Sequence, residues 1–184
     1  MIAPAIPAGV CPRLADDSRG VALTEFAFVF PVLLLLFLGG YQLSDGIACK
    51  RKVGLANRTI ADLGTRSKQV SAAEVDAMLA ASTQVMAPYR QASAQVRLTE
   101  VFTSNTGLTN VVWSRGRNGA AARAVGSVVT LPGTLRTNGT YLLMSEINYA
   151  YDPGVRFSIV GRKTLTDPLF MSPRNSDSVP CNDC

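Results

Sequence analysis

Two cysteines near the end of the sequence form its most recognisable chemical pattern. Cys181 and Cys184 make a C-x-x-C pair, and only Cys11 and Cys49 offer further thiols in the 184 residues. A four-cysteine zinc site would need all of them, and we expect Cys11 to be removed with a leader. We therefore expect a local disulfide between Cys181 and Cys184 in an oxidising compartment. The alternative is a solvated pair of free thiols in a frayed tail.

The remaining composition argues against an enzyme. The sequence contains no histidine, which removes Ser-His-Asp and Cys-His catalysis and H-E-x-x-H zinc hydrolysis. It has no G-x-x-x-x-G-K or S-x-x-K motif, and residues 115–119 (RGRNG) are typical of a basic turn rather than a phosphate loop. The net charge of +5 is spread along the chain, unlike the basic blocks of nucleic-acid-binding proteins. We expect no catalysis, no cofactor, no metal and no nucleic-acid partner.

One acidic side chain lies where a charge is costly. Residues 21–38 read VALTEFAFVFPVLLLLFL, whose only polar members are Thr24 and Glu25. As a helix they would be about 27 Å long, close to the hydrocarbon thickness of a bilayer. A carboxylate costs about 2.5–3.5 kcal/mol at the bilayer centre and less near the interface, so Glu25 needs a partner unless it snorkels to the headgroups. Pro31 lacks an N–H for the carbonyl of Ala27 and bends or loosens the helix, as kinks in ordinary anchors also do.

The twenty residues before this helix have the character of a leader peptide. They are rich in Pro, Ala and Gly and end in a charged stretch. An ordinary secretory signal would be cut after the apolar run, but residues 38–40 (LGG) fit a small-x-small site badly, and no cysteine follows an apolar run as lipidation requires. A cut between Gly20 and Val21 places Glu25 at mature position five and fits the pattern best.

The N-terminal pattern resembles a known family. Gly20 followed by VALTEFAFVFP, with Glu25 at mature position five and Pro31 at eleven, resembles the type IV pilin N-terminus. Its E-F-A-x-V-x-P form is similar to the TadE-like minor pilins of bacterial tight-adherence (Tad/Flp) pili. Residues 146–153 (EINYAYDP) and 171–174 (MSPR) are similar to the family's Y-x-Y-x-P and R-P-R endings, with a serine where one arginine is usual.

The resemblance implies a structural role and a set of partners. An aspartyl prepilin peptidase in the membrane would cut between Gly20 and Val21, and Glu25 would assist assembly or processing. Pro31 would help the subunit leave the bilayer and pack into a filament. The partners would be major and minor pilins, the prepilin peptidase, the inner-membrane assembly platform and membrane lipid.

The charges that flank the span favour the opposite topology from the resemblance. Two arginines precede it and four cations follow it within residues 50–58, so the positive-inside rule favours a cytoplasmic C-terminal domain. We expect instead a single pass through the bacterial inner membrane with a periplasmic domain, because long domains translocate largely regardless of charge. The basic run 50–52 is either a site for anionic lipid or a solvated helix face.

Beyond the span, the periodicity predicts two helices. Val53, Ala56, Ile60 and Leu63 recur at helical spacing, so the first helix should continue to about Gly64. Residues 71–74 (SAAE) form a capping box that should open a second helix. Its apolar side would carry Val75, Met78, Leu79, Val85 and Met86.

After Tyr89 the period changes to that of strands. We predict strands through 96–99, 111–113, 125–131 and 140–151, with a turn at Asn138-Gly139, and a last strand carrying Val155, Phe157 and Ile159. The predicted fold class is therefore α+β, with a long N-terminal transmembrane and stem helix, a second short helix, and an antiparallel sheet packed on the stem, as in pilins. Tyr141, Leu143, Ile147, Tyr149 and Tyr151 should share one face of the sheet.

The expected organisation has five parts. Residues 1–20 are the leader, 21–40 the transmembrane helix, 41–70 its amphipathic continuation, 71–174 a pilin-like α+β domain, and 175–184 a flexible tail with the C-x-x-C pair. The expected function is that of a minor pilin or assembly subunit of a Flp-type adhesion pilus. The alternative is a single-pass, membrane-anchored periplasmic binding domain whose leader is never cut.

Overall fold

The structure is a computed structural model that describes residues 18–153 and 161–184. Most of the predicted leader and the predicted strand through Val155, Phe157 and Ile159 lie outside the described residues. The chain forms two compact units, residues 1–43 and 44–184, and each is described by itself.

The predicted long N-terminal helix is present. Helix α2 runs from Ser18 to Arg66 over 49 residues and contains Pro31. Its apolar first part belongs to the first unit, and its amphipathic continuation, from Ser44, belongs to the second unit, which we call the domain. The helix continues without a break into the domain, as predicted from the apolar residues that recur at helical spacing as far as Leu63.

The second helix begins as its capping box predicts. Helix α3 spans Ala72–Gln84. The side chain of Ser71 accepts a hydrogen bond from the backbone N–H of Glu74, while the Glu74 carboxylate accepts one from the backbone N–H of Ser71 at 2.8 Å. Both contacts satisfy N–H groups that the first turn leaves without partners.

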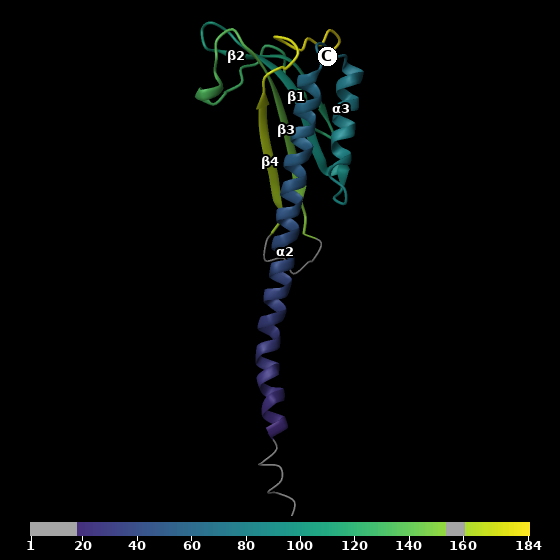
Figure 1. Ribbon diagram of the computed structural model, residues 1–184, viewed down its shortest axis with the longest axis vertical. Helices are drawn as coiled ribbons and strands as arrows, with labels where there is room; N and C mark the ends of the chain where they lie inside the picture. The colour runs from purple at the N-terminus through teal and green to yellow at the C-terminus, as the bar shows by residue number, and fades with distance from the viewer. Residues whose placement is uncertain (1–17, 154–160) are drawn as a thin grey trace, which may run out of the picture. The chain divides into compact units, whose positions relative to one another are not determined.

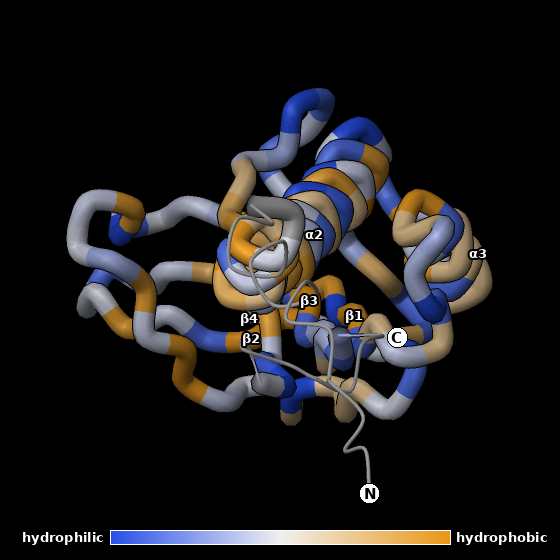
Figure 2. Tube along the Cα trace, turned by 90° about the horizontal axis from the view of Figure 1, so that it is seen from below, coloured by the Kyte–Doolittle hydropathy of each residue, from blue (hydrophilic) through white to orange (hydrophobic). Residues whose placement is uncertain are grey.

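The domain contains one four-stranded antiparallel sheet, so the α+β fold class is confirmed. The strands are β1 (Ala94–Thr103), β2 (Thr109–Arg117), β3 (Tyr141–Tyr151) and β4 (Lys163–Met171), in the order β2-β1-β3-β4. Two short 3-10 helices, η1 (Gln91–Ser93) and η2 (Gly133–Leu135), precede β1 and β3. Figure 1 shows the strands beside the domain part of α2, and Figure 2 shows α2 and α3 over the same side of the strands.

The core lies between this sheet face and the two helices. Helix α2 contributes residues at the predicted spacing, and the alternate residues of β1 and β3 face them. Val53 and Ile60 are buried against Leu98, Leu143 and their neighbours. The core also contains Cys49, Ala56, Val75, Leu79, Met86, Ala94, Val96, Trp113, Ile147, Tyr149 and Tyr151.

Two features of the sheet differ from the predictions. Residues 125–131 do not form a strand, because a turn with Gly126 at φ +79° leaves only an isolated bridge between Asn110 and Val128. Strand β4 was not predicted from the sequence, since Pro168 lies within it. Because β4 is an edge strand of the sheet, one of its sides has no partner strand, and the missing N–H of Pro168 is tolerated there.

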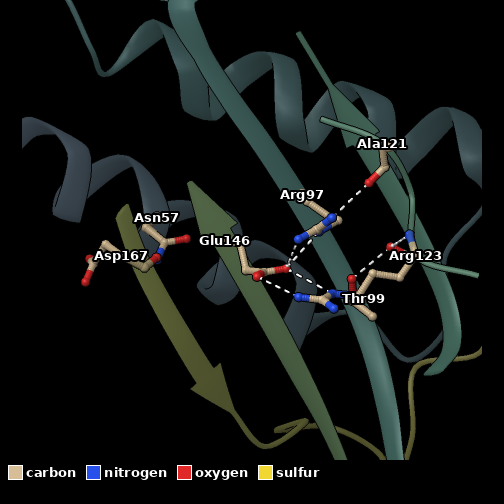
Figure 3. Close-up of polar contacts among 8 residues, drawn as sticks. Asn57, Arg97, Thr99, Ala121, Arg123, Glu146 and Asp167 are labelled. Carbon is tan, nitrogen blue, oxygen red and sulfur yellow. Dashed lines mark hydrogen bonds and ion pairs between the residues drawn. The ribbon is translucent and has the colours of Figure 1, made fainter. Parts of the chain in front are cut away.

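The opposite face of the sheet is held by an ion triplet. Glu146 accepts hydrogen bonds from Arg97 Nε at 2.7 Å and from Arg123 Nη2 at 2.9 Å (Figure 3). Arg97 also donates to the carbonyl of Ala121 at 2.9 Å. These contacts fix the connection between β2 and β3 against the sheet.

The stem is tied to the sheet by a buried amide. The side chain of Asn57 donates to the backbone carbonyl of Asp167 on β4, and its Oδ1 accepts a hydrogen bond from Ser145 Oγ on β3 at 2.6 Å. Because Asn57 is fully buried, these bonds satisfy groups that would otherwise be costly there.

Candidate functional site: the N-terminal apolar helix

The first part of α2 has an apolar surface that nothing in the structure covers. From Val21 to Phe37 the large apolar side chains are exposed, for example Phe28 at 79% and Phe37 at 71%. Within the described residues, one helix, starting at Gly20, is long and apolar enough to cross a membrane. An apolar surface of this extent requires lipid or protein around it.

Glu25 is exposed on this apolar helix and has no ion pair among the described residues. Val21 lies one turn earlier, and its backbone carbonyl accepts a hydrogen bond from Thr24 Oγ1 at 2.8 Å. In the intact chain the Val21 nitrogen belongs to an uncharged amide. A cut after Gly20 would turn it into an ammonium group, which is the kind of partner that a carboxylate in an apolar setting needs.

Pro31 lies inside the helix, nearly three turns after Val21. Its ring leaves the Ala27 carbonyl without its usual helical donor. Phe26 and Phe30 pack together just before it, with ring centroids 5.3 Å apart. The structure thus places Gly20, Val21, Glu25 and Pro31 on one helix.

A carboxylate that sequence reasoning missed lies at the start of the domain. Asp45 Oδ1 accepts a hydrogen bond from the Tyr89 hydroxyl at 2.9 Å, and its Oδ2 accepts one from the Tyr151 hydroxyl at 2.7 Å. Burial raises the pKa of both phenols, and the bonds to Asp45 raise them further, so both hydroxyls remain donors. We call these three residues the Asp45 clamp. Tyr151 belongs to the Y-x-Y segment, but its bond to Asp45, 106 residues earlier in the chain, was not predicted.

The C-terminal segment is fixed over the domain core, although we expected a flexible tail at 175–184. Val179 is fully buried, and its N–H donates to Glu100 Oε1 at 2.6 Å. Its carbonyl accepts a hydrogen bond from Trp113 Nε1 at 2.8 Å. The carbonyl of Pro180 accepts another from the N–H of Val70 at 3.0 Å. The tail therefore closes the core rather than trailing from it.

Burial raises the pKa of the Glu100 carboxyl, and the hydrogen bond from the Val179 N–H and the nearby Trp113 indole N–H oppose that rise only in part. Its Oε2 has no hydrogen-bond partner among the described residues. A glutamate at an alternate position of β1, on the side of Ala94, Val96 and Leu98, could have indicated a buried partner here. The tail supplies that partner.

The C-x-x-C pair is joined in the structure as a disulfide. The Cα atoms of Cys181 and Cys184 are 5.5 Å apart. Asp183 lies between them, and its Oδ1 accepts a hydrogen bond from the N–H of Ala72, in the first turn of α3, at 2.8 Å. The two sulfurs and the Asp183 carboxylate lie within 4.8 Å of one another. However, sulfurs joined in a disulfide are not the thiolates that a metal requires.

Comparison with known proteins gives one match, in the part of the chain that contains the glycine, the glutamate and the proline. The features above define a protein with one apolar N-terminal helix and an α+β domain. Residues 20–50 match the family model described as TadE-like protein. This N-terminal segment is therefore similar to TadE-like proteins. No curated protein and no solved structure matches the chain.

Proposed function

We propose that this chain is a minor pilin or assembly subunit of a tight-adherence (Flp-type) pilus, structural rather than enzymatic. It would be anchored in the bacterial inner membrane with its domain in the periplasm. Prepilin peptidase would cut it between Gly20 and Val21, and its N-terminal helix would then recruit it into or onto the filament. The observation that carries this proposal is Glu25 at the fifth position after Gly20, on an uncovered apolar helix within the TadE-like match.

The chemistry of the helix supports the proposal in two ways. The uncovered side chains of the first unit could pack against equivalent helices of other subunits once the chain leaves the bilayer. A carboxylate on that surface would favour a neighbour whose new Val21 ammonium lies beside it, since opposite charges attract strongly in an apolar setting. The apolar helix would supply affinity and Glu25 would set the register.

This role for Glu25 can be tested with a variant that keeps its size. Glu25→Gln should be inserted into the membrane and accumulate normally, because loss of a charge makes insertion easier. It should be poorly co-isolated with the other pilus subunits, and the cells should lose surface adhesion. Thr24→Val, at the adjacent position, keeps the charge of Glu25 and should co-isolate like the wild type. Normal assembly and adhesion of Glu25→Gln would make Glu25 a bystander.

The alternative function is an uncleaved, single-pass anchor for a periplasmic binding domain. It predicts that the leader stays on the chain and that Glu25→Gln has no effect on co-isolation with pilus subunits. The two proposals therefore differ in the mature N-terminus and in the partners that are recovered with the chain.

A further inference from the structure

The end of the domain that carries the Asp45 clamp is rich in cations without acidic partners. Lys50 and Arg51 follow Asp45 on α2. Arg90 adjoins Tyr89, whose hydroxyl bonds to Asp45. Lys163 pairs in register with Tyr151, which bonds to the same carboxylate. None of these four cations forms an ion pair with an acidic side chain in the described ranges, 18–153 and 161–184.

Several arginines elsewhere in the domain form ion pairs, whereas Arg58, Arg117 and Arg136 have none among the described residues. Arg66, Arg97, Arg115, Arg123 and Arg174 each contact an aspartate or a glutamate. Of the acidic groups near the clamp, Asp45 accepts bonds from two tyrosines and Asp152 pairs with Arg162 at 3.1 Å. Asp167 lies beside Lys50 and Arg51 but forms no ion pair among the described residues. Three separate parts of the chain therefore leave positive charge at one end of the domain, which we call the cationic base (Lys50, Arg51, Arg90 and Lys163).

Two hollows at the cationic base are lined by its positively charged side chains. One, of about 460 Å³, is lined by Arg90, Tyr151, Asp152, Arg162 and Lys163, with small polar neighbours. The other, also about 460 Å³, lies between α2 and β4 and is lined by Lys50 and Arg51 together with apolar side chains and Asp167. The two hollows share Thr164. Cations beside apolar and hydroxyl groups suit an amphiphile with an anionic head.

The sequence places Lys50 and Arg51 shortly after an uncharged stretch that is long enough to cross a bilayer. The stretch between Glu25 and Asp45 contains 19 residues and no charge. As a helix it is about 28 Å long, which matches the hydrocarbon core of a bilayer. Lys50 lies five residues beyond Asp45, or about 8 Å farther along the helix, within the layer that the headgroups occupy.

We propose that the cationic base is a docking surface for anionic phospholipid headgroups, with Lys50, Arg51, Arg90 and Lys163 binding their phosphates. The proposal rests on membrane anchoring in the proposed function, but not on leader cleavage or on Glu25. Bound headgroups would hold the domain against the bilayer surface, and their release would accompany extraction of the subunit from the membrane.

The test uses the full chain in mild detergent and native mass spectrometry. The probes are dioleoyl phosphatidylglycerol, dioleoyl phosphatidylcholine and free glycerol phosphate. We expect phosphatidylglycerol to bind at least about tenfold more tightly than phosphatidylcholine, with this preference declining as salt rises. Equal retention of both lipids would overturn the proposal, and so would free glycerol phosphate that competes as well as the lipid does.

Two variants of equal charge locate the site. Lys50→Gln/Lys163→Gln should lower the affinity for phosphatidylglycerol on the order of tenfold, since each cation near an anionic surface contributes several-fold. Arg58→Gln/Lys68→Gln removes the same charge farther along the chain and should change the affinity less than about twofold. Equal losses in both variants, or none in either, would overturn the proposal. An uncleaved chain that still prefers phosphatidylglycerol would contradict only the pilin function.

Discussion

The Tyr151 hydroxyl at the end of β3 donates a 2.7 Å hydrogen bond to Asp45 Oδ2 on α2. Tyr89 donates to the other carboxylate oxygen. The carboxylate is therefore held from two sides, one after α3 and one at the end of a strand. This clamp lies at the beginning of the domain and gives the Y-x-Y segment a structural role. The rings of Tyr149 and Tyr151 are both buried in the core.

Removing one hydroxyl of the clamp should destabilise the domain measurably. Tyr151→Phe keeps the buried ring but deletes a hydrogen bond to a charged group, so we expect a loss of about 1–2 kcal/mol in the free energy of unfolding. The measurement is urea unfolding of the full chain in detergent, followed by the fluorescence of Trp113, the one tryptophan in the sequence. Tyr41→Phe, on an exposed ring, is the matched control and should leave stability unchanged. Equal stabilities for Tyr151→Phe and wild type would show that the clamp contributes nothing.

Glu100 should make the stability of the domain depend on pH. Burial raises the pKa of its carboxyl above the ordinary value of 4.5, so the folded protein binds this proton more tightly than the unfolded chain does. The Glu100 contribution to stability is therefore most favourable below pH 4.5 and declines as the pH rises from there through the folded-state pKa. Glu100→Gln lacks this titration, and its stability should not show that decline.

The Glu100 experiment compares wild type with Glu100→Gln at each pH, so that contributions from the other carboxylates cancel. As the pH rises above 4.5, the wild type should lose unfolding free energy relative to Glu100→Gln. This difference should stay constant above the folded-state pKa of Glu100. Parallel curves from pH 4 to 8 would mean that burial does not perturb Glu100.

Local patterns in the sequence were enough for the helices and for the paired central strands. The capping box at Ser71 determines where α3 begins, because its contacts join residues three apart. The alternation of apolar and polar residues identified β1 and β3, because one face of each strand is buried against the helices. The apolar first part of α2 was also predicted from local sequence, because residues 21–38 form a nearly unbroken apolar run.

Long-range contacts determined what the sequence did not show. In β2, a register shift opposite Glu100/Val101 leaves Val112 unpaired. Trp113 therefore lies in the core under the helices, whereas Val111 lies in a second apolar cluster with Val129 and Leu131. A bulge of this kind depends on the partner strand. The anchoring of the tail depends on Glu100 and Trp113, about 80 and 66 residues earlier.

The cysteines report the compartment of the domain. The disulfide between Cys181 and Cys184 should persist if the domain faces the oxidising side of the membrane. In denatured samples from cells quenched with acid, a maleimide reagent should label only Cys49 before reduction and all three mature cysteines afterwards. Cys49, the free buried thiol, is the internal control for labelling. Labelling of Cys181 and Cys184 without a reductant would support a cytoplasmic domain and contradict the filament model.

The mature N-terminus tests the central claim most directly. Intact-mass measurement and N-terminal sequencing of the chain, taken from membranes of a host with active prepilin peptidase, should give Val21 as the first residue. Gly20→Asp should block the cut while the protein stays in the membrane, because the apolar helix is unchanged. A wild-type chain that begins at Met1, or one that begins near Tyr41 after the apolar run, would contradict the pilin function.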